Sequence, residues 1–293
     1  MKAQKYQVVI RDKLPNTQVL KLWDLLGLKV KDHSSSNDVN YLKDITPDRS
    51  FFTFEKGVFS FHGSSNLLIS TKDIAKQVNR LNGQSFSSKN QPFAKALGLN
   101  NRKEGNWILD GTLGLGKDYF LANAFGFKVI GMEKSSLCFA LLGTFLLTAG
   151  YASESKICFM NTEEFLINYN LLINPGDELA NNAPLLCTDT YGKGEISLLS
   201  KMCFKSPPSA IYLDPMYDEK NETALPNKFM QVLRGELGSD DVEDFEKLFM
   251  TALKIAKDRV ILKRSKKSDI KFKKYFSFSC EGKSTRYDVY LNR

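Results

Sequence analysis

The sequence predicts an α/β fold, in which a mostly parallel sheet has helices on both faces and follows a small α+β region. From residue 106 onward, short apolar runs alternate with longer helical segments, and this alternation is typical of a parallel sheet covered by helices. Residues 1–95 differ, because alternating apolar residues there flank a glycine turn. We therefore expect an N-terminal accessory region over 1–95 and a larger domain over 96–293.

In the N-terminal region, a strand is expected at 7–10 and a short amphipathic helix at 15–26. Apolar residues then alternate with others at 51–54 and at 58–61, on either side of Glu55-Lys56-Gly57. Two such runs around a glycine turn predict a β-hairpin. Together these segments indicate a small α+β unit.

The strands of the larger domain share short apolar sequences and are expected at 107–109, 128–132, 157–160, 211–213 and 259–262. The helices between them are expected at 117–125, over a long apolar segment that ends at Ala149, and at 240–256. A closing antiparallel hairpin is expected near 276–278 and 287–290. Residues 170–206 match no element, and we interpret them as an insertion.

The composition limits the kinds of protein that this chain can be. The chain has 293 residues, of which 42% are hydrophobic and 12% aromatic, and this is enough for a well-buried core. Its formal net charge of +8 favours an acidic partner, with nucleic acid as the first candidate. Five cysteines are widely spaced, and with two histidines and no CxxC pair they do not form a zinc pattern. We therefore expect no metal and a reducing compartment.

The sequence also bears on location. The first residues lack the apolar core of a signal peptide. Residues 135–153 are uncharged, but they include serine, threonine and glycine and follow directly on a predicted strand. We therefore expect a buried helix there, no membrane contact and a cytoplasmic protein.

A glycine loop follows the first strand of the larger domain. Between Asp110 and Gly116, both Gly114 and Gly116 fall at the strand-to-helix turn, where the absence of a Cβ lets the backbone approach a ligand closely. The third glycine of a dinucleotide motif is missing, which disfavours a nicotinamide oxidoreductase. Asp110 and Asp118 make the loop acidic, which favours a sulfonium amino acid over a pyrophosphate. Glu133 ends the second strand, where its carboxylate is placed to accept hydrogen bonds from ribose hydroxyls.

These features predict a site for S-adenosylmethionine whose residues are Asp110, Gly114, Gly116, Asp118 and Glu133. Glu163 and Glu164 follow the third strand and have two interpretations. They face the same cleft, or they belong to the first turn of a helix that Thr162 caps. The sequence does not decide between these two roles.

The segment Asp214-Pro215-Met216-Tyr217 directly follows another apolar strand. There the Asp214 carboxylate and the Pro215 carbonyl are placed to accept hydrogen bonds from an exocyclic amine, and Tyr217 to stack on its ring. A carboxylate matches the adjacent N1–H and 2-amino donors of guanine better than the donor and acceptor of adenine. The segment predicts methyl transfer to the amine of a base, with Asp214 and Tyr217 as catalytic residues. The alternative is a simple turn at a strand end.

Basic residues are concentrated after the strand at 259–262, namely Lys263, Arg264, Lys266, Lys267, Lys271, Lys273 and Lys274. Contacts from such residues to phosphates would position RNA without reading its sequence. Lys220 and Lys228 lie just past the Asp-Pro-Met-Tyr segment and are better placed to steer a nucleotide into the pocket. The alternative for the basic run is a solvated surface.

The chain resembles the ribosomal small-subunit methyltransferase J family, which makes N2-methylguanosine in 16S rRNA. The resemblance covers about residues 85–291 and rests mainly on the motifs at 110–118, 133–134, 213–217, 263–264 and 286–290. The Asp-Pro-Met-aromatic form of the third motif is the most specific. The resemblance implies a Rossmann-like class I methyltransferase fold and S-adenosylmethionine as cofactor. It also implies small-subunit rRNA, or the assembled small subunit, as partner.

In the family, cofactor contacts fall at positions that match Lys117, Asp118, Glu133, Lys134, Glu163, Glu164 and Asp214. The resemblance implies that Asp214 serves both the cofactor side and the substrate side of the cleft. The chain departs from the family pattern at Lys117, where arginine is usual, and at Tyr217-Asp218, where phenylalanine and proline are usual. Residues 85–90 replace a glycine-rich segment. These departures bear on the nucleotide more than on the reaction.

Two other functions remain open. The same cofactor could serve a different amine, such as adenine N6 or a protein glutamine. A noncatalytic RNA-binding protein could also be built on the same fold. The sequence does not indicate an oligomeric state, and it does not distinguish naked rRNA from an assembled subunit.

Overall fold

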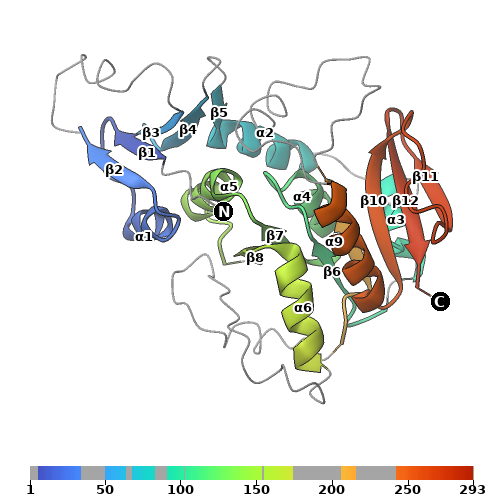
Figure 1. Cartoon of the computed structure of the whole chain (residues 1–293). Coiled ribbons are helices and arrows are strands. Elements are labelled where there is room, and N and C mark those ends of the chain that lie inside the picture. The colour runs from blue at the N-terminus through green and yellow to red at the C-terminus, as the bar shows by residue number, and fades with distance from the viewer. Residues whose placement is uncertain are drawn as a thin grey trace.

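The computed structural model describes residues 6–33, 50–63, 68–82, 91–101, 103–153, 155–173, 206–215 and 242–292. Within these residues the strands form two sheets (Figure 1). One has seven strands in the order β11-β12-β10-β9-β6-β7-β8, and the other has five in the order β2-β1-β3-β4-β5. All strands of the five-stranded sheet precede residue 71, and all strands of the seven-stranded sheet follow residue 106.

The seven-stranded sheet consists of β6 (Trp107–Asp110), β7 (Lys128–Glu133), β8 (Ile157–Phe159), β9 (Ala210–Leu213), β10 (Arg259–Ser265), β11 (Phe278–Glu281) and β12 (Thr285–Leu291). Strands β6 to β10 pair in parallel, whereas β12 pairs antiparallel with both β10 and β11. The predicted parallel sheet and closing antiparallel hairpin are therefore confirmed, but the first strand of the hairpin begins at Phe278, two residues later than expected.

The direction in which the sheet grows reverses at β6. The chain runs outward from β6 to β7 and β8, and it then returns to place β9 and β10 on the other side of β6. The two neighbouring strands β6 and β9 are parallel. Ligands of open α/β sheets bind at such a switch point, beyond the carboxyl ends of the strands.

Helices cover both faces of this sheet, as predicted (Figure 1). On one face, α4 (Lys117–Ala124) and α5 (Ser136–Thr148) contribute to one apolar core. On the other, α6 (Thr162–Ile173) and α9 (Val242–Ile255) pack together over a second core that includes Leu109, Phe165 and Phe249. Two short helices, α3 (Pro92–Ala96) and η3 (Leu99–Asn101), precede β6.

The N-terminal sheet contains β1 (Gln7–Ile10), β2 (Lys29–Asp32), β3 (Phe51–Glu55), β4 (Val58–His62) and β5 (Leu68–Ser70), with helices α1 (Thr17–Leu25) and α2 (Thr71–Asn82). The predicted hairpin is β3 and β4, and Gly57 in its turn has a φ of 73°. The predicted helix begins two residues late, because the Asn16 side chain accepts a hydrogen bond from the Val19 N–H and caps it.

The apolar helix α5 lies between the large sheet and the N-terminal region. On the N-terminal side, the indole N–H of Trp23 in α1 donates to Thr144 Oγ1 over 2.9 Å, and both side chains are fully buried. Gly143 leaves room for Leu22, whose Cδ2 lies 2.7 Å from the place of an added Cβ. This contact explains why the helix is apolar on every side. Among the described helices, none has the length and apolarity to cross a membrane.

Two sequence predictions need correction. Helix α6 continues to Ile173, so the first residues of the expected 170–206 insertion belong to it, and 174–205 lie outside the described residues. Strand β10 continues to Ser265, three residues beyond its expected end. Lys263 and Arg264 therefore belong to the sheet and not to the loop after it.

Candidate functional site

Acidic side chains meet at the carboxyl edge of the large sheet. Asp110 ends β6, Glu133 ends β7 and Asp214 follows β9, while Asp118 comes from the first turn of α4. Parallel strands present their carboxyl ends at one edge, so these positions converge although they are far apart in the sequence. The predicted cluster is therefore assembled by the fold.

The glycine loop is tied to Glu133. Gly114 and Gly116 have φ values of 55° and 78°, which favour glycine, and Gly116 directly precedes α4. The Gly114 N–H donates to Glu133 Oε2 over 2.7 Å, and the Ser135 N–H donates to Glu133 Oε1 over 2.7 Å. No heavy atom of the described residues lies within 4 Å of the position that a Cβ on Gly114 would take. The loop is fixed in place and open on its outer side.

Thr112 joins the loop to the Asp214 backbone, a link that the sequence analysis did not predict. Its Oγ1 accepts a hydrogen bond of 2.6 Å from the Asp214 N–H, and its own N–H donates to Asp110 Oδ1 over 3.2 Å. Gly111 leaves no room for a side chain, because an added Cβ would lie 2.8 Å from Leu213 and 2.8 Å from Thr162. This close packing brings the loop and Asp214 together.

A network of charges links the two sides of the site. The Lys263 ammonium group lies 2.8 Å from Asp118 Oδ2 and 2.8 Å from Asp214 Oδ2. The hydroxyl of Tyr212 donates to the same Asp118 oxygen over 2.6 Å. The sequence analysis did not select Tyr212, and nothing in its apolar strand distinguishes it from a core residue.

The environment changes the pKa values of the three aspartates. Burial and the Asp118 charge raise the pKa of Asp110 well above its usual range. Burial also raises the pKa of Asp214, although the Lys263 charge opposes this rise. For Asp118, burial opposes ionisation, but the Lys263 charge and hydrogen bonds from Lys263 and Tyr212 hold the pKa below its usual value. The Lys263 charge therefore favours the ionised form of each of these three carboxyls.

Other predicted cofactor residues lie around this centre. Lys117, Lys134 and Glu164 are exposed, and Glu163 is half-buried. The interpretation of Thr162 as a cap is wrong, because its hydroxyl donates to the Gly111 carbonyl over 2.6 Å. The cap is instead the side chain of Asn161, which accepts hydrogen bonds from the N–H groups of Glu163 and Glu164.

Pro215 is half-buried beside Asp214. Tyr217, Lys220 and Lys228 lie outside the described residues, so their predicted roles stay predictions.

Two of the basic residues that were predicted to contact RNA do not lie in the exposed loop after β10. Leu262 pairs with Leu213 in parallel register, so Lys263 lies beside Asp214 and points into the charge network. Arg264 is buried, with 8% of its surface exposed, and cannot serve as a phosphate contact on the surface. The prediction that these two residues bind RNA phosphates is therefore corrected.

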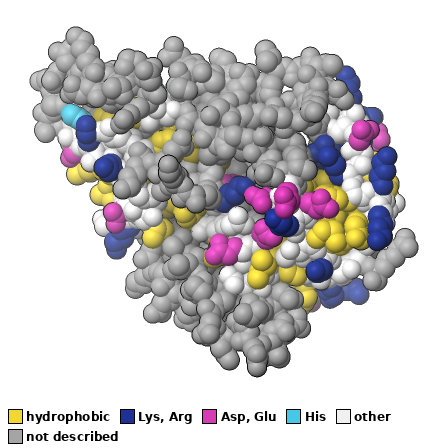
Figure 2. Space-filling view, viewed as in Figure 1, with side chains coloured by type: hydrophobic (Ala, Val, Ile, Leu, Met, Phe, Trp, Pro, Cys, Tyr) yellow, Lys and Arg dark blue, Asp and Glu magenta, His cyan; other side chains and the backbone are white. Residues whose placement is uncertain are grey.

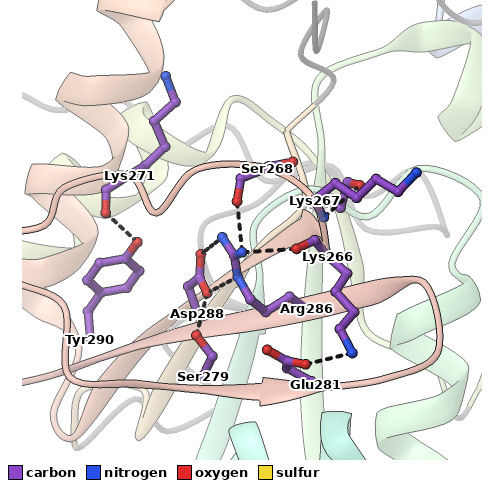
Figure 3. A network of polar contacts seen from close by, with 10 residues as sticks. Lys266, Lys267, Ser268, Lys271, Ser279, Glu281, Arg286, Asp288 and Tyr290 are labelled. Carbon is purple, nitrogen blue, oxygen red and sulfur yellow. Dashed lines mark hydrogen bonds and ion pairs between the residues drawn. The ribbon is translucent and has the colours of Figure 1, made fainter. Parts of the chain in front are cut away.

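The loop after β10 is held by a buried ion pair (Figure 3). Arg286 Nε lies 2.6 Å from Asp288 Oδ1, and Asp288 is fully buried. Arg286 Nη1 donates to the carbonyl of Ser268 over 2.7 Å, and Ser279 Oγ donates to Asp288 Oδ1 over 2.7 Å. This network anchors the segment that carries the remaining lysines.

The lysines of this loop are exposed. The Tyr290 hydroxyl donates to the Lys271 carbonyl over 2.9 Å, which fixes the backbone below the Lys271 side chain. Lys266 lies 2.7 Å from Glu281, and both side chains are about half exposed. Lys267 is exposed as well. Figure 2 shows lysine and arginine side chains along the side of the molecule formed by β10 to β12.

The residues at the carboxyl edge fit S-adenosylmethionine. Glu133 Oε2 accepts the Gly114 N–H and Oε1 accepts the Ser135 N–H, so this carboxylate lies directly against the glycine loop, where a carboxylate can accept ribose hydroxyls. The open space outside Gly114 leaves room for a ligand against the backbone. The aspartates suit the positive charges of a sulfonium amino acid. This donor set agrees with the predicted cofactor.

Comparisons with known proteins agree with the geometry. A family model described as a putative SAM-dependent methyltransferase matches residues 63–167 and 191–292. The ribosomal RNA small subunit methyltransferase J of Saccharophagus degradans is 32% identical over 207 residues, which cover 69% of this chain and 68% of that protein. The protein of the same name from Alteromonas mediterranea is 28% identical over 280 residues, or 90% and 96% of the two chains.

A solved structure matches nearly the whole chain. A SAM-dependent methyltransferase from Neisseria gonorrhoeae superimposes with a TM-score of 0.59 over 98% of this chain and 96% of that one. Its sequence is 22% identical. At this level of identity the match shows a common fold, which includes the N-terminal region.

Proposed function

Because this chain belongs to the ribosomal RNA small subunit methyltransferase J family of SAM-dependent methyltransferases, we propose that it methylates the exocyclic 2-amino group of a guanosine in small-subunit (16S) rRNA. The observation that carries the proposal is the placement of Asp214. Its backbone is bound to the glycine loop through Thr112, and its side chain is 37% exposed at the edge of the sheet. It thus lies between the cofactor loop and solvent.

On the cofactor side, Gly114 and Glu133 would hold the nucleoside part of S-adenosylmethionine, and Asp110 and Asp118 would lie near its charged part. The family resemblance adds Lys117, Lys134, Glu163 and Glu164 as further contacts, alongside Gly116 of the loop. When bound, S-adenosylmethionine supplies a methyl group activated by the positive charge on sulfur.

On the substrate side, the protein would orient a weak nucleophile. The lone pair of an exocyclic amine is delocalised into the ring, so catalysis depends on position and electrostatics. The Asp214 carboxylate and the Pro215 carbonyl would accept hydrogen bonds from the amine, and the carboxylate also suits the guanine N1–H. Tyr217 would stack on the base, an interaction worth about 1–3 kcal/mol in single-strand binders.

The exposed lysines beside the site would bind the RNA backbone. Lys266 and Lys267, with the neighbouring lysines of the same loop, would contact phosphates, while Lys220 and Lys228 would steer the nucleotide. The pair of Lys266 with Glu281 is exposed, and such pairs contribute little, so it does not prevent a phosphate contact. The target base would have to be unpaired or flipped to reach Asp214. The substrate would be encountered in the cytoplasm, as rRNA or as an assembled small subunit.

The test is direct. The protein is incubated with methyl-labelled S-adenosylmethionine and small-subunit rRNA that lacks its methyl groups, and the RNA is digested to nucleosides. We expect label in N2-methylguanosine. Label in N6-methyladenosine, or in protein glutamine, would keep the reaction type and refute the acceptor.

A second arm of the test offers assembled small subunits to the same protein. If S-adenosylmethionine binds but neither substrate takes up label, the proposed reaction is wrong. If S-adenosylmethionine does not bind at all, a noncatalytic RNA-binding role is favoured instead.

A further inference from the structure

Lys263 occupies a central place in the site that its sequence context does not suggest. It lies in β10 with a side chain 22% exposed, and its ammonium group is 2.8 Å from both Asp118 and Asp214. The register of β10 with β9 fixes this place, because Leu262 pairs with Leu213 and the following residues are neighbours. The contact is therefore built into the sheet.

The two carboxylates have different exposure. The Asp118 side chain is 12% exposed, and its Oδ2 already accepts from both Tyr212 and Lys263. The Asp214 side chain is 37% exposed, and Lys263 contacts only its Oδ2. Among the described residues, none donates a hydrogen bond to Asp214 Oδ1. One oxygen of Asp214 is thus held by Lys263, and the other has no hydrogen-bond donor among the described residues.

Among the described residues, charged and titratable groups reach this point from β6, α4, β9, β10 and β12. They are Asp110 of β6, Lys117 and Asp118 of α4, Tyr212 and Asp214 at β9, Lys263 of β10 and Tyr287 of β12. Three are carboxylates that repel one another when all are ionised. Lys263 is the cation in direct contact with two of them, whereas Lys117 is exposed.

We propose that Lys263 is a positioning residue for methyl transfer: its ammonium group holds Asp214 Oδ2 in place and keeps the carboxylate ionised, so that Oδ1 accepts a hydrogen bond from the acceptor amine. This role rests on the proposed function for its catalytic consequence. A protonated Asp214 would present a donor where the amine needs an acceptor. Tyr212 stabilises the arrangement indirectly, because its hydroxyl donates to Asp118, the second carboxylate that contacts Lys263.

The proposal is tested with Lys263→Met, which removes the charge at similar length, and Lys263→Arg, which keeps it. The matched control is Lys128→Met, an exposed lysine at the amino end of β7, on the opposite edge of the sheet. Activity requires ionised Asp214, so it falls as the pH drops through the pKa of that carboxyl. A nearby opposite charge shifts a carboxyl pKa by about 1–3 units.

For Lys263→Met we expect the acid limb of the kcat–pH profile to move upward by about one to three pH units. Well below the pKa of Asp214 in both proteins, such a shift corresponds to a loss of about ten- to a thousandfold, and the loss would shrink as the pH rises. Lys263→Arg and Lys128→Met would keep the acid limb of the parent protein. A uniform loss at every pH would mean that Lys263 is only structural, and the proposal would be wrong.

A second readout does not depend on turnover. Carbon-13 NMR of the aspartate carboxyls follows the titration of Asp214, assigned by the signal that Asp214→Asn removes. We expect a higher titration midpoint in Lys263→Met than in the parent protein and in Lys128→Met. An unchanged midpoint would overturn the proposal. If the parent protein methylates no guanosine, the proposed function fails, yet this titration still decides the role of Lys263.

Discussion

Asp214 is held from two directions. Thr112 binds its backbone N–H and Lys263 binds one carboxylate oxygen, so neither the chain nor the side chain is free to turn. Burial raises its pKa, and the Lys263 charge counteracts this. The second carboxylate oxygen of Asp214 therefore has a fixed position from which to accept a hydrogen bond. Holding this charged group partly buried costs solvation free energy.

Replacing Asp214 tests that role. Asp214→Asn keeps the shape but offers a donor in place of one acceptor oxygen, and Asp214→Ala removes both oxygens. We expect each to lower single-turnover methylation of rRNA by roughly 10²-fold or more, because the amine is no longer oriented. Circular dichroism would check that the fold is intact. Near-normal turnover in either variant would remove Asp214 from the catalytic residues.

Replacing Gly131 tests whether close packing between β7 and Leu113 holds the cofactor loop in place. A Cβ there would lie 2.6 Å from Leu113 Cδ1 and 2.9 Å from Cδ2, and Leu113 directly precedes Gly114. We expect Gly131→Ala to cost about 1–3 kcal/mol of stability by overpacking and to weaken S-adenosylmethionine binding, measured by calorimetry. The double variant Gly131→Ala with Leu113→Ala should recover part of both losses. Additive losses in the double variant would contradict the clash.

At the scale of elements, α5 depends on the N-terminal region. The helix buries one side against the large sheet and the other against α1 and β4. Its side chains from Leu137 to Leu147 are all buried. Without the N-terminal region, α5 would expose an apolar face to water, so the two regions share one core.

Removing the buried hydrogen bond between Trp23 and Thr144 tests how far the stability of α5 depends on the N-terminal region. Thr144→Val keeps the shape but leaves the indole N–H unpaired, and an unsatisfied buried donor costs about 1–3 kcal/mol. We expect a loss of that size in the free energy of unfolding by urea. The control is Thr148→Val, because Thr148 is exposed and its hydroxyl donates to the Thr144 and Phe145 carbonyls of its own helix. Equal losses in the two variants would show that the link between the regions carries no stability.

At the scale of the whole molecule, charge is distributed unevenly. The carboxyl edge of the sheet gathers aspartates, while lysines are exposed on the neighbouring loop after β10. Arg286 and Asp288 tie that loop to the sheet (Figure 3). Because the anchor is buried, the lysines are presented from a defined backbone and lose less conformational entropy on binding.

This distribution predicts the salt dependence of RNA binding. Each phosphate contact contributes about 0.7–0.9 to the slope of log K against log salt concentration. Replacing Lys266, Lys267, Lys271 and Lys273 by glutamine should therefore flatten the slope for rRNA fragments by about that amount for each phosphate that is no longer neutralised. As a control, Lys21, Lys72, Lys76 and Lys128, which are dispersed over other elements, are replaced together. An unchanged slope in the first variant would identify the loop as a solvated surface.

The local pattern was sufficient for much of the fold. Apolar runs such as Ile211-Tyr212-Leu213 predicted the strands. The alternation with helices predicted parallel pairing, because parallel strands need a long crossover connection, which is usually a helix. Since parallel strands end at one edge, Asp110, Glu133 and Asp214 could be placed together without coordinates. The Asp-Pro-Met-Tyr motif then connected that edge to a family.

Only the tertiary structure decided the role of Lys263. In the sequence it is one of several lysines in a basic run, and local pattern cannot separate a lysine that faces carboxylates from one that faces water. The strand order, with β9 between β6 and β10, and the register of Leu262 with Leu213 turn it inward. The burial of α5 by Trp23 has the same origin. Both depend on contacts between residues distant in the chain, which leave no local periodicity by which they could be recognised.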